Sequence, residues 1–172
     1  MFYPVKDGKV ILGTGDENSP FIVGATSTGL LKTISKAISA YSEHRLPIVF
    51  HFDGTFKLNV TEFPLVVIGL TDGGQHFHPL AFFTVSHRTT NTYVTLIRAF
   101  KAHLIDAGIV GDHFYPHFIM ADAEVAEHNA FKSEFPQSKY LMCYFHVKQN
   151  VISRFTGTAE ELEGKHCHYL KY

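Results

Sequence analysis

Cysteine is scarce in this sequence, a long apolar run is missing, and basic residues are not in excess. The two cysteines, Cys143 and Cys167, are too few for a disulfide framework, which favours a reducing compartment. No run of about 18 apolar residues occurs, so the sequence predicts no membrane-spanning helix and no membrane partner. With 15 Lys and Arg against 16 Asp and Glu, the net charge of −1 lacks the basic excess typical of nucleic-acid-binding proteins.

The composition otherwise indicates a folded, globular protein. The 172 residues are 45% hydrophobic and 14% aromatic, enough for one domain with a sizeable core. We predict an N-terminal extension with one helix over residues 1–46, a core over 47–155 and a tail over 156–172. Hydrophobic spacing places the helix of the extension at residues 27–43. Turn signals in residues 1–23 indicate irregular structure or a hairpin there.

Within the core, strand and helix patterns follow one another in an informative order. The first three predicted strands, joined by short links that favour an antiparallel meander, are residues 47–52, 63–70 and 77–85. The alternating helices and strands that follow are residues 90–107, 114–120, 124–134, 140–144 and 146–155. This order resembles the ribonuclease-H-like α/β fold, a mixed sheet of three antiparallel strands and then two parallel strands with flanking helices. In that topology the first and fourth strands lie side by side and run parallel.

Two aspartates stand at the ends of predicted strands. Asp53 follows the first strand and Asp122 follows the fourth, so the fold would bring both to one edge of the sheet. Magnesium prefers such carboxylate oxygens, and two cations about 3.5–4 Å apart can clamp the attacking and leaving oxygens of a phosphoryl displacement. Asp53 and Asp122 are therefore candidate metal ligands and catalytic residues. Two other interpretations stay open: Asp53-Gly54 is also typical of a hairpin turn, and Asp122 of a helix N-cap.

Histidines and cysteines add further candidates. His51 lies two residues before Asp53, so both side chains point to one face, and we expect the histidine to pack or hydrogen-bond beside the site. Cys143 and His146 form a C-x-x-H pair, half of a zinc site, which His-Cys-His at residues 166–168 could complete. We do not expect zinc here, because a buried thiol and an oriented imidazole need no metal.

Taken together, these pieces resemble the transposase domain of Mutator-like elements (MULE). The matching segments are residues 53–57 (DGTFK), 64–69 (PLVVIG), 79–82 (PLAF), 121–124 (ADAE), 129–131 (NAF), 135–136 (FP) and 143–150 (CYFHVKQN). The order and spacing of the segments carry the resemblance, which covers roughly residues 48–155.

The resemblance implies a ribonuclease-H-like DDE core that cleaves and rejoins DNA at transposon ends with Mg²⁺ or Mn²⁺. Asp53 matches the first acid and Asp122 the second, while Cys143 and His146 match a C-x-x-H signature of structural or DNA-related role. The third acid, a glutamate, is expected beyond a helical insertion, and the sequence ends at Tyr172 before reaching it. A nuclear location and compatibility with a homo-oligomer are implied by the resemblance alone.

Three features depart from the family pattern. The glutamates at residues 160, 161 and 163 are not assigned the role of the third acid. Residues 1–46 hold no counterpart of the family's zinc-binding DNA-recognition module. The segment Ser-His-Arg-Thr-Thr at residues 86–90 lacks the acidic residue expected there.

Three hypotheses follow. The first is a fragment of a Mutator-like DDE transposase that is catalytically incomplete because the third acid is missing. The second is a non-catalytic DNA-binding or transcription-regulatory protein derived from a transposase. The third is a zinc-stabilised interaction domain built on Cys143, His146, Cys167 and His168.

Overall fold

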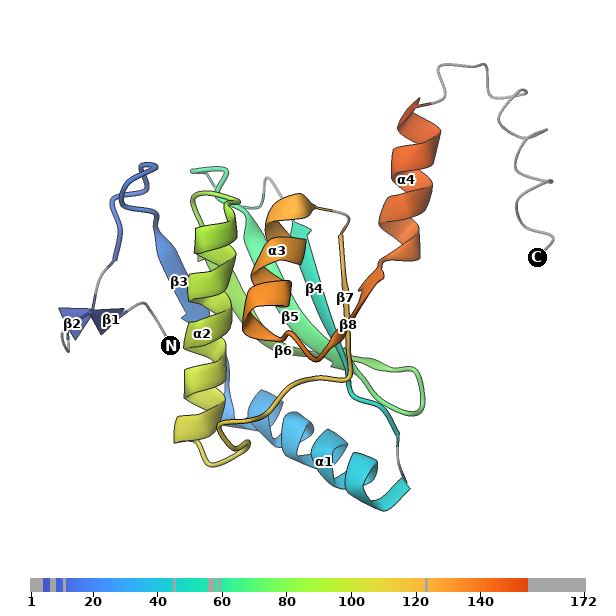
Figure 1. The fold of residues 1–172 in the computed structure, drawn as a ribbon. Helices are drawn as coiled ribbons and strands as arrows, with labels where there is room; N and C mark the ends of the chain where they lie inside the picture. The colour runs from blue at the N-terminus through green and yellow to red at the C-terminus, as the bar shows by residue number, and fades with distance from the viewer. Residues whose placement is uncertain are drawn as a thin grey trace.

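A six-stranded mixed sheet with helices packed against it forms the body of the protein (Figure 1). The computed structural model describes residues 5–6, 9–10, 12–44, 46–55, 58, 60–122 and 124–154. The strands of the sheet, in spatial order, are β3 (Ile22–Ala25), β6 (Phe77–Val85), β5 (Leu65–Thr71), β4 (Val49–Thr55), β7 (Phe118–Ala121) and β8 (Lys139–Met142). The helices are α1 (Thr28–His44), α2 (Thr90–Asp106), α3 (Val125–Glu134) and α4 (Tyr144–Arg154). The predicted ribonuclease-H-like class is confirmed in that the sheet mixes antiparallel and parallel strands with flanking helices.

The strands β4, β5 and β6 form the predicted antiparallel meander. The turn between β5 and β6 is built around Asp72, whose carboxylate accepts hydrogen bonds from the backbone N–H groups of Gly74 and His76, both at 2.9 Å. His78 lies 2.8 Å from the other carboxylate oxygen, and this contact, together with the backbone hydrogen bonds from His76 and Gly74, lowers the pKa of Asp72 to about 2. Asp72 thus stabilises one of the short links expected between the antiparallel strands.

The parallel half of the sheet brings the first and fourth predicted strands together. β7 pairs with β4 in parallel, with His51 opposite Met120, and β8 pairs with β7 in parallel. Two predicted boundaries were wrong. β4 does not end at residue 52 but continues to Thr55, because β5 pairs with it over that whole length. The hairpin-turn interpretation of Asp53-Gly54 is thereby excluded, since both residues are paired within the strand.

The second wrong boundary is the start of β7. This strand begins at Phe118 rather than at residue 114, because residue 114 still closes a turn through a 3.0 Å bond from its backbone N–H to the carbonyl of Gly111. The apolar run is therefore longer than the strand. Phe114 packs on Phe50 with ring centroids 5.9 Å apart. Phe114 is therefore hydrophobic because it packs against the core, although it is not part of a strand.

One strand of the sheet was not predicted. β3 pairs antiparallel with β6 and forms an edge of the sheet, although residues 1–23 were expected to be irregular or a hairpin. The run is only four residues long and contains a glycine, which hides its strand character from a pattern search. Two shorter strands before it, β1 (Val5–Lys6) and β2 (Lys9–Val10), pair with each other as a separate antiparallel ribbon. The predicted division into 1–46, 47–155 and 156–172 stays a prediction.

The helices α2 and α3 lie side by side on one face of the sheet, and α1 crosses the sheet near the end where β4 begins (Figure 1). Thr89 caps α2, since its side-chain oxygen accepts a hydrogen bond from the N–H of Thr92 at 3.2 Å. Beyond the C-terminus of α2, Gly108 has φ +65°, the left-handed conformation that commonly ends a helix. α4 extends away from the sheet past the end of β8. No helix in the described part of the chain is long and apolar enough to cross a membrane.

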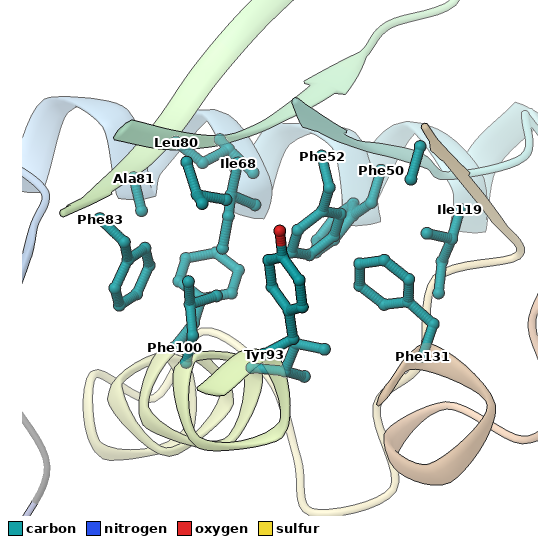
Figure 2. Close-up of a cluster of buried hydrophobic side chains, with 14 of the residues drawn as sticks. Phe50, Phe52, Ile68, Leu80, Ala81, Phe83, Tyr93, Phe100, Ile119 and Phe131 are labelled. Atoms are coloured by element: carbon teal, nitrogen blue, oxygen red, sulfur yellow. The ribbon is translucent and has the colours of Figure 1, made fainter. Parts of the chain in front are cut away.

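The core lies between this face of the sheet and the helices α2 and α3. Figure 2 shows aromatic rings from both layers meeting there. Phe52 of β4 meets Phe131 of α3 edge to face at 4.4 Å, and Phe50 lies 6.3 Å from Phe100 of α2. Residues with even numbers in β4 point into this core, which leaves the odd-numbered ones, Asp53 among them, on the other face.

Removal of a core side chain from α2 tests this packing. Leu96 is fully buried, so Leu96→Ala should lower the free energy of unfolding by about 2–5 kcal/mol, measured by urea denaturation. Leu58 is 61% exposed, so Leu58→Ala serves as the matched control and should change the same quantity by less than about 0.5 kcal/mol. Equal effects of the two substitutions would contradict the packing described here.

Candidate functional site at the ends of β4 and β7

Asp53 is presented to solvent from a rigid strand. It lies inside β4, paired with Val67 of β5, and its neighbours Phe52 and Phe50 anchor the strand in the core. Its side chain is 54% exposed. The pairing of β4 with β7 stops at His51, so the carboxylate emerges where the two parallel strands part. A carboxylate on a fixed backbone with an open approach is suited to holding a cation.

Asp122 is the first residue after β7. His51 and Met120 are the last residues that β4 and β7 pair with each other. If the same register continued for two more residues, Asp53 would lie opposite Asp122. The backbone around Asp122 is held from β8, because the hydroxyl of Tyr140 donates to the carbonyl of Asp122. One residue earlier, the carbonyl of Ala121 accepts from the N–H of Cys143 at 2.8 Å. The N-cap interpretation of Asp122 was wrong, since α3 begins at Val125 after an N-cap at Glu124.

The C-x-x-H pair lies beside Asp53. His146, in the first turn of α4, places its Nε2 atom 3.6 Å from Oδ1 of Asp53. Asp53, His146, Cys143 and His51 all line one pocket of about 260 Å³, together with Phe52, Phe77, Met120 and Phe145. Asp122 is not among the residues that line it. The structure therefore joins the first predicted acid to the C-x-x-H pair.

His51 occupies the back of this pocket. Its Nε2 lies 2.5 Å from the hydroxyl of Thr71, and its ring meets Phe77 edge to face at 5.6 Å. Partial burial lowers the pKa of His51, which favours the neutral ring. The prediction that this histidine packs and hydrogen-bonds beside the site is confirmed.

The zinc alternative needs four residues, of which the structure describes two, Cys143 and His146. Its second half, Cys167 and His168, lies outside the described residues, as do the glutamates at 160, 161 and 163. Within the described ranges, no group of three or more His, Cys, Asp or Glu side chains is arranged to hold a metal ion. Cys143 is a free thiol of intermediate exposure.

A polar network behind Asp122 was missed by the sequence analysis. The guanidinium of Arg88 donates to Glu124 at 2.5 Å and to the Tyr93 hydroxyl at 3.2 Å, and that hydroxyl donates to Glu124 at 3.1 Å. Arg88 precedes α2, Tyr93 is in α2, and Glu124 precedes α3. The network thus links the segment between β7 and α3 to the N-terminal part of α2. The bond between Arg88 and Glu124 is charge-assisted, and such bonds are stronger than those between neutral groups.

Glu127 is an unusual member of the same region. Its side chain is buried in α3, and neither carboxylate oxygen has a hydrogen-bond partner within ordinary distances. Burial, followed by the negative charge of Glu124, raises the pKa of Glu127 to about 8, with Asp122 adding to the shift and Arg88 opposing it. Glu127 is therefore largely protonated at neutral pH. A neutral carboxyl is far less costly to bury than a carboxylate.

Two sequence signals could have revealed this region. Glu127 stands three and four residues before Ala130 and Phe131, which are buried on the same side of α3, so helical spacing places it on the apolar face. Arg88 stands where the family pattern led us to expect an acid. Its pairing with Glu124 explains how a positive charge is accommodated at that position.

The pH dependence of stability should report the burial of Glu127. Between its ordinary pKa of 4.5 and about 8, the folded protein holds a proton that the unfolded chain has lost. The free energy of unfolding therefore falls as pH rises through this window, by at most about 1.4 kcal/mol per pH unit for this group. Glu127→Gln keeps the shape and removes the titration, so the difference in unfolding free energy between wild type and variant should shrink steadily from pH 8 to pH 5. The exposed Glu17→Gln is the control, and a pH-independent difference for Glu127→Gln would contradict the burial.

Comparison with known families completes the description of the site. A search among curated proteins finds no match to the chain. The family model of the MULE transposase domain matches residues 49–150, which is more than half of the chain. The match runs from the start of β4 into α4 and so contains Asp53, Asp122, Cys143 and His146. The resemblance drawn from the sequence is confirmed, and the chain belongs to the MULE transposase domain family.

Proposed function

We propose that this domain is the core of a Mutator-like DDE transposase, in which Asp53 and Asp122 share a divalent cation, Mg²⁺ or Mn²⁺, for DNA cleavage and strand transfer. Membership of the family makes the chain transposase-related and connects it in general to DNA and to divalent metals. The observation that supports the residue assignment is the parallel register of β4 and β7, because that register, if continued two residues past its last pair of His51 and Met120, would bring Asp53 opposite Asp122.

The donor set at this edge fits a hard divalent cation. Both side chains are carboxylates, Asp53 is open to solvent within β4, and Asp122 directly follows β7, so the sheet fixes the backbone on which each stands. The backbone at Asp122 is held further by two hydrogen bonds. The hydroxyl of Tyr140 donates to the carbonyl of Asp122, and the N–H of Cys143 donates to the carbonyl of Ala121. Open coordination positions would remain for water and for phosphate oxygens of the substrate.

A bound cation would supply Lewis-acid activation of a water or 3′-hydroxyl nucleophile and stabilisation of the departing oxygen. The role of the protein side chains would be to hold the cation in place. Asp53 and Asp122 orient the cation from two strands, and the Arg88–Glu124 pair fixes the loop between β7 and α3. The nearby carboxyl of Glu127 is kept neutral by burial, so it adds little negative charge beside Asp122 at neutral pH.

Catalytic incompleteness is part of the proposal. Among the described residues, two aspartates are the acids assigned to the site, and no third acid joins them in a metal-holding group. A site with two carboxylates binds a cation weakly and loses most of the rate of a complete site. The same observation favours a second candidate function: a transposase-derived DNA-binding or transcription-regulatory protein without cleavage activity. Either function would be exercised in the nucleus, and self-association at DNA ends is compatible with both.

Metal titration tests the assignment of the two aspartates. Isothermal titration with Mn²⁺ should show binding by the wild-type protein that is abolished in Asp53→Asn and in Asp122→Asn, because each substitution removes a charged oxygen ligand. Asp106→Asn, at the exposed end of α2, is the matched control and should bind as the wild type does. Unchanged binding by Asp53→Asn would remove the proposed metal role.

Gel-shift measurements across salt concentrations separate the two candidate functions. A DNA-binding domain should lose affinity linearly on a log–log plot as salt rises, because phosphate contacts release counterions. Affinity with Mn²⁺-dependent nicking of the probe would support the transposase core, and affinity without nicking would support the regulatory alternative. Absence of DNA affinity at low salt would reject both.

A further inference from the structure

We propose that the pocket beside Asp53 receives one unpaired base of the DNA substrate, which stacks on the exposed aromatic rings of Phe77 and Phe145. The inference rests on the proposed function, because it takes DNA as the substrate and Asp53 as part of the site that acts on the DNA backbone. It adds a contact to a base, whereas the proposed metal site concerns the phosphate. It needs no protein ligand to the cation beyond the two aspartates.

Two large aromatic side chains at this pocket are left mostly in water. Phe77, at the start of β6, is 51% exposed, and Phe145, in the first turn of α4, is 60% exposed. Both line the pocket of about 260 Å³ that Asp53 also lines. Exposed rings that gather at one pocket are typical of a ligand site, and single-stranded nucleic acids bind by stacking their bases on such rings.

Phe77 is held in place by the sheet beneath it. A Cβ atom at Gly69 of β5 would lie 2.3 Å from the Cε2 and Cζ atoms of Phe77, so the ring packs directly on the backbone of the glycine. The ring of His51 meets it nearly at right angles, with centroids 5.6 Å apart. A ring that is already in place loses little side-chain entropy when a base stacks on it.

The remaining walls offer the mixture of apolar and polar groups that a base requires. Met120 pairs with His51 across β7 and β4, so both side chains lie on the face of the sheet that carries Asp53. Its thioether is an adaptable apolar surface. Polar atoms come from Cys143 and His146. Nε2 of His146 lies 3.6 Å from Oδ1 of Asp53, too far for a good hydrogen bond, so this nitrogen can still bond to the edge of a base.

The position of the pocket beside Asp53 determines its occupant. Asp53 would hold the cation that contacts a phosphate of the strand being cut, so the base of an adjacent nucleotide comes next to the pocket. In a duplex that base is paired and stacked, and it can enter a pocket only after it has left the helix. Stacking on an aromatic ring accepts any base, so the site would act on distorted or unpaired DNA with little preference for sequence.

Two matched DNA duplexes test the inference. One is fully paired, and the other carries a single unpaired 5-iodouracil; both are bound at low salt in EDTA and followed by fluorescence anisotropy. The wild-type protein should bind the duplex with the unpaired base more tightly. Phe77→Ala and Phe145→Ala should each weaken that binding by roughly tenfold, the loss expected for one stacked base. Phe145→Tyr keeps the ring and should bind as the wild type does.

A matched control and a direct readout accompany these measurements. Tyr115 is 40% exposed and does not line this pocket, so Tyr115→Ala should leave the affinity unchanged. Irradiation couples 5-iodouracil to an aromatic ring in contact with it, and mass spectrometry of the digested complex should locate the new bond at Phe77 or Phe145. This readout uses the wild-type protein, so it does not depend on how well a variant folds.

The outcomes separate this inference from the function on which it rests. Equal affinity of the wild-type protein for the two duplexes, or a crosslink outside the pocket, would overturn the inference and leave the two-aspartate metal proposal standing. If Phe145→Ala instead turned a dimer into a monomer in sedimentation and kept its DNA affinity, the rings would serve a contact between copies of the chain, and the inference would be wrong. Absence of affinity for both duplexes would reject DNA binding and the inference together.

Discussion

The parallel pairing of β4 with β7 is the constraint on which the candidate site depends. It joins two segments far apart in the sequence, and its last pair is His51 with Met120, two residues before Asp53 and Asp122. The strands are held in this register by the aromatic core beneath them, where Phe50 and Phe52 of β4 meet rings from α2, α3 and the segment before β7. A slip by one residue would move those rings to the wrong face, so the burial that stabilises the fold also fixes the acids.

Several charged or buried polar side chains lie at the junction between β7 and α3. Arg88, Tyr93 and Glu124 form a bonded triangle that links the junction to α2. Glu127 lies beneath it as a buried carboxyl whose pKa is raised by desolvation and by Glu124. Perturbed titratable groups gather where a site is being shaped, and here they lie next to Asp122. On the other side, α4 brings the C-x-x-H pair to Asp53.

The sequence predicts the fold where hydrophobic period and turn chemistry agree. The meander β4–β6 and the helix α2 were both predicted because local signals and tertiary packing coincide there. β3 escaped prediction because a four-residue edge strand carries too little pattern. The contact between Asp53 and His146 escaped it because that contact depends on how distant elements pack. The burial of Glu127 was missed although its helical spacing to Ala130 and Phe131 indicates it.

The central claim is that Asp53 and Asp122 grip a common cation at the sheet edge. The most direct measurement is an anomalous difference map from crystals of the protein soaked in Mn²⁺. The account predicts a peak between β4 and β7, within coordination distance of carboxylate oxygens from both aspartates. A map with no peak there, or one in which the metal contacts neither aspartate, would contradict it.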